Sequence, residues 1–219
     1  MNAVKAKSSY HHGDLREALL VAAEELLNEE GLQALTLRAC ARRAGVSHAA
    51  LKHHFNDIAE LLSEVSARGF DRLTRALKTA RAAAADDPVE RFVAVSRTYV
   101  SFARNNQALF RLMFRWDGLT VENRALLLAA ARTFAEMTNS ITVQRDEPDV
   151  TPETLDVRTA DRALQNDILI GWSHIHGYAQ LFIEGQFSGF AAEEGADAFI
   201  ERTLRETGAR ISGLLRSGS

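Results

Sequence analysis

The sequence predicts an all-α protein in which a three-helix N-terminal domain precedes a larger helical domain. Its 219 residues include only three prolines, so long stretches lack the residue that most strongly interrupts helices. Alanine, leucine, arginine and glutamate, which favour helices, dominate the composition. Apolar residues recur along most of the chain at the three- and four-residue spacing of a helix face.

The composition also narrows the class of protein. The chain is 46% hydrophobic and 25% charged, which is typical of a globular domain with a sizeable core. No apolar run reaches the roughly 18 residues of a membrane span, and the N-terminus lacks the apolar stretch of a secretion signal. Cys40 is the only cysteine, so no internal disulfide can form. These features favour a cytoplasmic protein that does not bind membranes.

The first helix is expected to begin at Asp14, with Glu17 three residues later in the capping-box relation. Gly31 is the expected stop. The apolar face of this helix consists of Leu15, Leu19, Ala22, Leu26 and Leu27. Its remaining surface is acidic because it carries Glu24, Glu25, Glu29 and Glu30. We therefore expect this helix to support the domain and not to lie along phosphates.

A basic segment follows. Residues 31–56 contain Arg38, Arg42, Arg43 and Lys52 and no acidic residue, which gives a charge of +4. The whole chain carries −3, so the other residues together carry −7. A compact basic unit within an acidic protein is typical of a nucleic-acid contact surface.

The same segment has the pattern of a helix-turn-helix. Thr36 is a natural N-cap for a short second helix, and Ser47 for a third. Gly45 provides the positive φ that the tight turn between them needs. On the third helix, Leu51 and Phe55 share the inward face. The outward face then carries Ala49, Lys52 and His53, with His48 at its boundary.

The run from Tyr10 to Leu62 resembles the N-terminal domain of TetR-family transcriptional regulators, with nearly every core position in register. The resemblance implies a helical homodimer that binds a palindromic operator and is released by a small molecule. It implies phosphate contacts from Thr36 and Ser47, base contacts near His48 and Ala49, and backbone contacts from Lys52 and His53. The predicted DNA-binding residues are therefore Thr36, Arg38, Ser47, His48, Ala49, Lys52 and His53.

Two positions depart from the family pattern. Lys52 stands where a tyrosine is usual, and Ile58 stands where a lysine is frequent. Our hypothesis is that Lys52 takes over a phosphate contact from the missing lysine. The alternative is a solvated lysine with no partner on the DNA.

The remaining helices follow from periodicity and capping signals. We expect a DNA-binding domain at 10–60 and an effector-binding and dimerisation domain at 61–219. A helix begins at Asn56, a suitable N-cap, and runs to the break at Asp86-Asp87-Pro88. The next begins near Pro88 and ends at Asn105-Asn106. Further helical patterns cover roughly 109–116, 121–143, 160–182 and 200–215, with a break at 145–153.

Each of the last two helical patterns has a broad apolar surface, wider than one neighbouring helix could bury. They are expected to pair with their copies as an intermolecular four-helix bundle, the dimer that the family resemblance also implies. Trp172, His176 and Gly177 resemble the motif of the WHG-type C-terminal domain found in a subset of these regulators. Gly177 and Ala179 would let another helix approach closely.

An apolar ligand site is expected in the C-terminal domain, and its effector is expected to be small and apolar. The candidate ligand-binding residues are Tyr99, Phe102, Phe110, Met113, Phe134, Trp172 and His176, with Trp116 and Met137 as further aromatic and sulfur side chains. The alternative for each is an ordinary core residue, and for His176 a histidine bonded to a carbonyl.

Metal binding and catalysis are not expected, and no cofactor is implied. The pairs His11-His12, His53-His54 and His174-x-His176 lack the spacing of a metal site on a helix. Gly171-Trp-Ser173 begins like a nucleophile elbow, but its second glycine comes two residues late. We therefore expect a ligand-responsive, sequence-specific DNA-binding regulator, most simply a repressor. The alternative is a dimeric ligand-binding helical protein that does not bind DNA.

Overall fold

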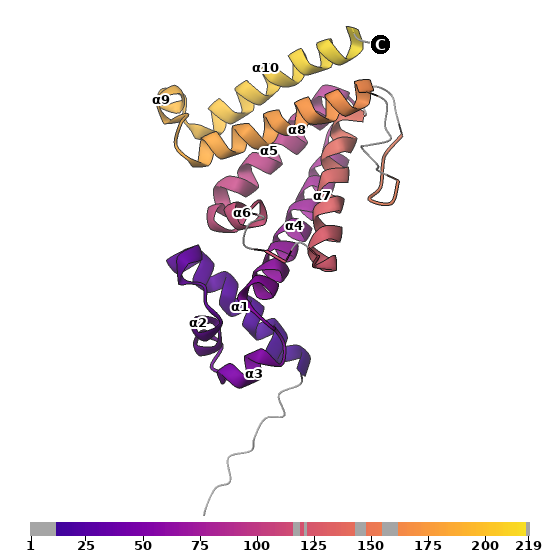
Figure 1. Ribbon diagram of the computed structural model, residues 1–219. Coiled ribbons are helices and arrows are strands. Elements are labelled where there is room, and N and C mark those ends of the chain that lie inside the picture. Colours follow the sequence, from indigo (N-terminus) through magenta and orange to yellow (C-terminus); the bar gives the residue numbers. More distant parts are fainter. Residues whose placement is uncertain (1–11, 116–118, 121, 143–147, 155–161, 218–219) are drawn as a thin grey trace, which may run out of the picture.

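The computed structural model describes residues 12–115, 119–120, 122–142, 148–154 and 162–217, and all of its regular elements in these ranges are helices. Three helices form the N-terminal unit: α1 (His12–Glu30), α2 (Leu37–Arg43) and α3 (His48–Lys52), with a 3-10 turn, η1 (Leu32–Ala34), after α1. In Figure 1 this unit lies at one end of the molecule, with α3 at its tip.

The helix α4 (Ile58–Ala83) connects the N-terminal unit to the larger domain. Its N-cap is Asp57, whose carboxylate accepts from the Glu60 N–H at 2.8 Å. The prediction of Asn56 as the cap is therefore wrong. Asn56 instead donates from its backbone and side-chain nitrogens to the Glu60 carboxylate, at 2.8 and 2.9 Å. The expected domain boundary at residue 60 falls within the first turn of α4, so this helix serves both parts.

The larger domain contains six more helices in the described ranges: α5 (Pro88–Asn105), α6 (Gln107–Met113), α7 (Arg124–Thr142), α8 (Arg162–Ile183), α9 (Ser188–Ala191) and α10 (Ala196–Ser217). The structure matches the expected helical patterns to within a few residues, whereas the short α9 was not expected. Pro88 is the first residue of α5, and the Asp87 side chain caps it. The expected break at 145–153 is described only from Pro148, where the chain is not helical.

The core of this domain forms around α4 and α5. α4 packs against α7 and α5, whereas α8 and α10 both pack against α5. The α4–α6 contact is especially close, because a Cβ placed on Gly69 would lie 2.6 Å from Met113 Sδ. Only glycine at this position lets the two helices approach to their observed distance.

Ion pairs join α1 to α4. Arg72 Nη1 lies 2.7 Å from Glu24 Oε2, Arg68 pairs with both Glu17 and Glu24, and Arg16 pairs with Glu64. The acidic surface of α1 therefore binds arginines of the protein itself, as expected of a supporting helix. None of the described helices is both long enough and apolar enough to cross a membrane.

Candidate nucleic-acid interface and internal cavity

Two side-chain hydroxyls cap the helices of the helix-turn-helix. Thr36 Oγ1 accepts from the Ala39 N–H, and Ser47 Oγ accepts from the Ala50 N–H, both at 3.1 Å. Both predicted caps are confirmed. Thr36 and Ser47 are also exposed. Because a hydroxyl can accept and donate at once, each retains its proton for an outside acceptor such as a phosphate oxygen.

The turn between α2 and α3 fixes how the third helix faces. Gly45 has φ 69°, and the Val46 N–H donates to the Ala41 carbonyl at 2.9 Å. Leu51 and Phe55 are 0% and 1% exposed, which anchors α3 from inside. The opposite face presents the exposed side chains of His48, Ala49, Lys52 and His53. The structure thus places all four predicted residues of the third helix region on one accessible surface.

The cations of this segment divide into two groups. Arg38, Arg42 and Lys52 are exposed, and no ion pair holds them within the described part of the chain. Arg43 instead points back to α1, where its guanidinium lies 2.7 Å from Glu29, 3.5 Å from Glu25 and 3.4 Å from Glu30. The charge of +4 assigned to the contact surface is therefore too high, because α1 neutralises Arg43.

Ile58 has a role that the sequence did not reveal. It is half-buried, packs against the core, and lines a shallow groove together with Leu35 of the N-terminal unit and Leu112 of α6. An apolar side chain at this position contributes to the contact between the two parts of the protein.

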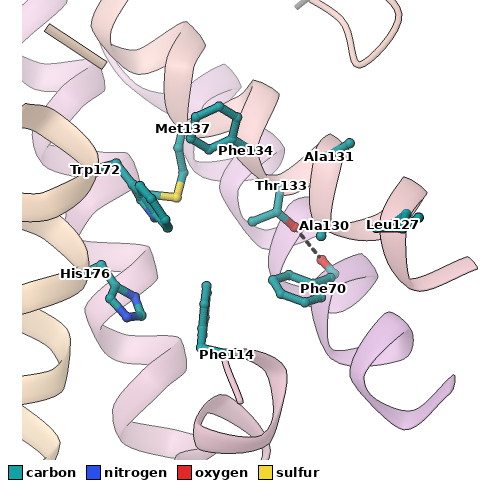
Figure 2. Close-up of a pocket in the computed structure, with 10 residues that line it drawn as sticks. All are labelled: Phe70, Phe114, Leu127, Ala130, Ala131, Thr133, Phe134, Met137, Trp172 and His176. Atoms are coloured by element: carbon teal, nitrogen blue, oxygen red, sulfur yellow. Dashed lines mark hydrogen bonds between the residues drawn. The ribbon is translucent and has the colours of Figure 1, made fainter. Parts of the chain in front are cut away.

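The larger domain contains a cavity of about 500 Å³. Helices α4, α7 and α8 and the end of α6 border it, as Figure 2 shows. The lining is almost wholly apolar and consists of Phe70, Phe114, Leu127, Ala130, Ala131, Thr133, Phe134, Met137, Trp172 and His176. Such a volume and lining suit a small organic molecule.

The predicted ligand-binding residues fall into two sets. Phe134, Met137, Trp172 and His176 line the cavity. The others do not: Tyr99, Phe110 and Met113 are 0% exposed and belong to the packed core, Phe102 is a half-buried residue packed against it, and Trp116 lies outside the described residues. The sequence did not identify Phe70 as a lining residue, because the apolar pattern of α4 is typical of core residues.

Besides the indole of Trp172, the described lining of the cavity has two polar side chains, Thr133 and His176. Thr133 Oγ1 is already engaged, because it donates to the carbonyl of Phe70 at 3.1 Å or Ala129 at 3.2 Å and contacts Thr74 Oγ1 at 2.7 Å. His176 Nδ1 lies 2.9 Å from the Tyr99 hydroxyl. The expected alternative, a histidine bonded to a carbonyl, does not apply. Burial lowers the pKa of His176 and raises that of Tyr99, so both side chains are neutral at neutral pH.

Aromatic contacts connect the cavity wall across three helices. The His176 ring lies 4.4 Å from the Phe114 ring, and the Phe114 ring lies 5.4 Å from that of Phe70 on α4. On the other side, Trp172 meets Phe134 edge to face at 5.7 Å. A molecule in the cavity would therefore contact α4, α7 and α8 together.

One face of α8 is apolar and open. Leu169, Ile170 and Leu181 are 50%, 52% and 43% exposed. A Cβ on Gly177 would meet no atom within 4 Å, so this glycine leaves room for another helix, as expected. Ala179 does not, because it is 0% exposed and faces the core of its own chain.

The described residues contain no group of three or more histidine, cysteine or acidic side chains arranged for a metal ion. His11 lies outside them. Cys40 is fully buried on α2, and burial raises the pKa of its thiol to about 11. Its thiol is thus an unreactive part of the core.

Two protein families match this chain. Residues 19–65 match the bacterial regulatory proteins of the tetR family, which covers the helix-turn-helix. Residues 92–207 match the tetracyclin repressor-like C-terminal domain. The second match covers more than half of the chain.

Individual proteins are also similar to this chain. The HTH-type transcriptional activator FasR of Mycolicibacterium smegmatis is 31% identical over 105 residues, 48% of this chain and 48% of that protein, so the chain spans about half the length of this curated relative. A protein of unknown function from Rhodococcus sp. RHA1 has a similar structure, with a TM-score of 0.72, 29% identity and coverage of 93% and 98%. The TetR-family regulator PfmR of Thermus thermophilus shares the fold, with a TM-score of 0.56, 22% identity and coverage of 88% and 96%.

Proposed function

Because this chain belongs to the TetR family and is thus a DNA-binding transcriptional regulator, we propose that it acts in the cytoplasm as a homodimer. The dimer binds a palindromic operator, and a small apolar molecule in the C-terminal domain releases it. The observation that supports this proposal most strongly is the combination of an exposed helix-turn-helix face with an apolar cavity bordered by α4, the helix that connects the two parts.

DNA binding is proposed to use seven residues of α2, α3 and their caps: Thr36, Arg38, Ser47, His48, Ala49, Lys52 and His53. Arg38 and Lys52 supply salt-dependent phosphate contacts, and the hydroxyls of Thr36 and Ser47 supply hydrogen bonds. His48 and Ala49 lie at the start of α3, where a recognition helix meets base edges. The short side chain of Ala49 leaves the backbone of α3 close to the bases.

The proposed dimer forms through α8 and α10. Leu169, Ile170 and Leu181 supply exposed apolar surface, and Gly177 allows a close approach. Two recognition helices must lie roughly 34–36 Å apart to enter successive major grooves. The position of Trp172, His176 and Gly177 on α8 supports a C-terminal domain of the WHG type.

Ligand control is proposed to act on this spacing. A molecule that binds better to a dimer with the wrong spacing shifts the population away from the operator-bound state. Repression follows where the operator overlaps the promoter. FasR, the relative from Mycolicibacterium smegmatis, is named an activator. If this protein activates from an operator upstream of the promoter, release by the ligand would remove that activation.

Selection of bound fragments from random DNA, repeated with candidate effectors, tests the proposal. We expect recovery of one palindromic sequence and its loss when an effector is added. Failure to enrich any sequence would favour the alternative, a dimeric ligand-binding protein without DNA binding. An effector that binds the protein but leaves operator affinity unchanged would refute the release mechanism.

A further inference from the structure

The hydrogen bond between Tyr99 and His176 determines which polar group faces the cavity. Tyr99 is fully buried, and a buried hydroxyl proton needs an acceptor. Within the described part of the protein its partner at 2.9 Å is His176 Nδ1. Trp172, which influences the same phenol, has only an N–H and so offers no acceptor for the phenol proton. The phenol must donate to Nδ1.

This direction fixes the tautomer of the imidazole. A neutral imidazole carries one proton, so if Nδ1 accepts, the proton is on Nε2. The hydrogen bonds of His176 within the described residues do not use Nε2. The ring itself lines the cavity, between Trp172 and Phe114 in Figure 2. Within the described lining, the Nε2–H of His176 is thus an available hydrogen-bond donor on a mostly apolar surface.

The lining also limits the charge of the occupant. Among the described residues that line the cavity there is no lysine, arginine, aspartate or glutamate. The hydroxyl of Thr133 is already bonded to carbonyls of the protein. The site opens to solvent beside Leu127, which is 45% exposed. An ion held against its apolar wall would still lose part of its hydration without a counter-charge, which costs more than burying a neutral polar atom that finds a donor.

We propose that the cavity selects an uncharged, largely apolar molecule that presents one acceptor oxygen, such as a ketone or ester carbonyl, to the Nε2–H of His176. Tyr99 is the positioning residue, because it holds the donor tautomer. This inference rests on the proposed effector function and specifies the chemistry of the ligand.

Three probes of similar size test the inference by calorimetric titration of the full-length protein: butyrophenone, butylbenzene and 4-phenylbutyrate. We expect His176→Phe to weaken butyrophenone binding about 3- to 10-fold, the range for one hydrogen bond, and to leave butylbenzene binding unchanged. Thr133→Val is the matched control and should not change the ratio of the two affinities. The anion 4-phenylbutyrate should bind most weakly.

A second measurement does not depend on whether the His176 variant folds. Nitrogen chemical shifts of the His176 ring should show a protonated Nε2 and an unprotonated Nδ1 in the wild type, and Tyr99→Phe should allow the other tautomer. A protonated Nδ1 in the wild type would overturn the inference. So would equal losses for both neutral probes, or stronger binding of the anion. If neither neutral probe binds, this inference fails, whereas the proposed ligand control is decided separately by the operator-release experiment.

Discussion

At the scale of single residues, Arg38 and Arg43 show how position decides the use of a charge. Both belong to α2. Arg38 is exposed, whereas Arg43 is held by three glutamates of α1. The sequence predicted the basic segment, but not this division, because the partners of Arg43 lie 13 to 18 residues earlier in the chain.

Alanine substitutions should separate these roles. Arg38→Ala and Lys52→Ala should each reduce the slope of log K against log salt for operator binding by about 1, because each removes one phosphate contact. Arg43→Ala is the matched control and should leave the slope unchanged, since its charge is already neutralised. Filter binding between low and moderate salt provides the measurement. An unchanged slope for Lys52→Ala would show that this lysine is only solvated.

The two histidines of α8 predict how stability depends on pH. Burial lowers the pKa of both His174 and His176 in the folded protein. As the pH falls through about 6.5, the ordinary value, the unfolded chain takes up protons that the folded chain does not. The free energy of unfolding should therefore decrease from pH 7.5 to 5.5. Urea unfolding should show a smaller decrease for the His174→Gln/His176→Gln variant, and an equal decrease would contradict the assignment.

At the scale of elements, the sequence predicted the caps of α2 and α3 but not the start of α1, which begins at His12, two residues before the expected Asp14. Thr36 and Ser47 were correct because a hydroxyl three residues before a free N–H is enough to cap a helix. At α4 the predicted cap was Asn56, whereas the neighbouring Asp57 caps the helix. Packing distance is also absent from the sequence. Gly69 gave no signal, although it sets the distance between α4 and α6.

Gly69→Ala should therefore destabilise the protein. A new Cβ would lie 2.6 Å from Sδ and 2.9 Å from Cγ of Met113, so this fully buried side chain would have to shift. Overpacking costs about 1–3 kcal/mol, whereas alanine gains only about 1 kcal/mol of helix propensity. We expect a net loss of about 1 kcal/mol in chemical denaturation. In a Met113→Ala background the clash disappears, so the same substitution should be neutral or stabilising; a loss in both backgrounds would contradict the packing explanation.

At the scale of the whole molecule, the exposed face of α8 predicts a dimer. Ile170→Asp should produce monomers in sedimentation experiments, because it places a charge in the proposed apolar interface. Ile170 is 52% exposed within one chain, so the variant should still fold. Leu128→Asp, at a residue 38% exposed on α7, is the matched control and should leave the dimer intact. A dimeric Ile170→Asp variant would place the interface elsewhere.

The fold and the surface of the helix-turn-helix were predictable from the sequence, whereas the cavity was predictable only in part. Trp172 and His176 were found because they share a helix face. Phe70 and Phe114 were missed, because each lies in an apolar segment where nothing distinguishes a cavity wall from core. Tyr99 was chosen for the wrong reason: it does not line the cavity, but orients the histidine that does.

The continuity of α4 has a mechanical consequence. Phe70 touches the cavity, and Arg68 and Arg72, two positions to either side, are held by Glu24 of α1. The backbone between these residues is continuous helix. No hinge therefore separates the cavity contact of Phe70 from the ion pairs that hold the N-terminal unit. We therefore expect a small tilt imposed at Phe70 to turn the N-terminal unit with it. Because α3 lies at the end of this unit far from the larger domain (Figure 1), such a rotation would displace the residues that would meet the DNA.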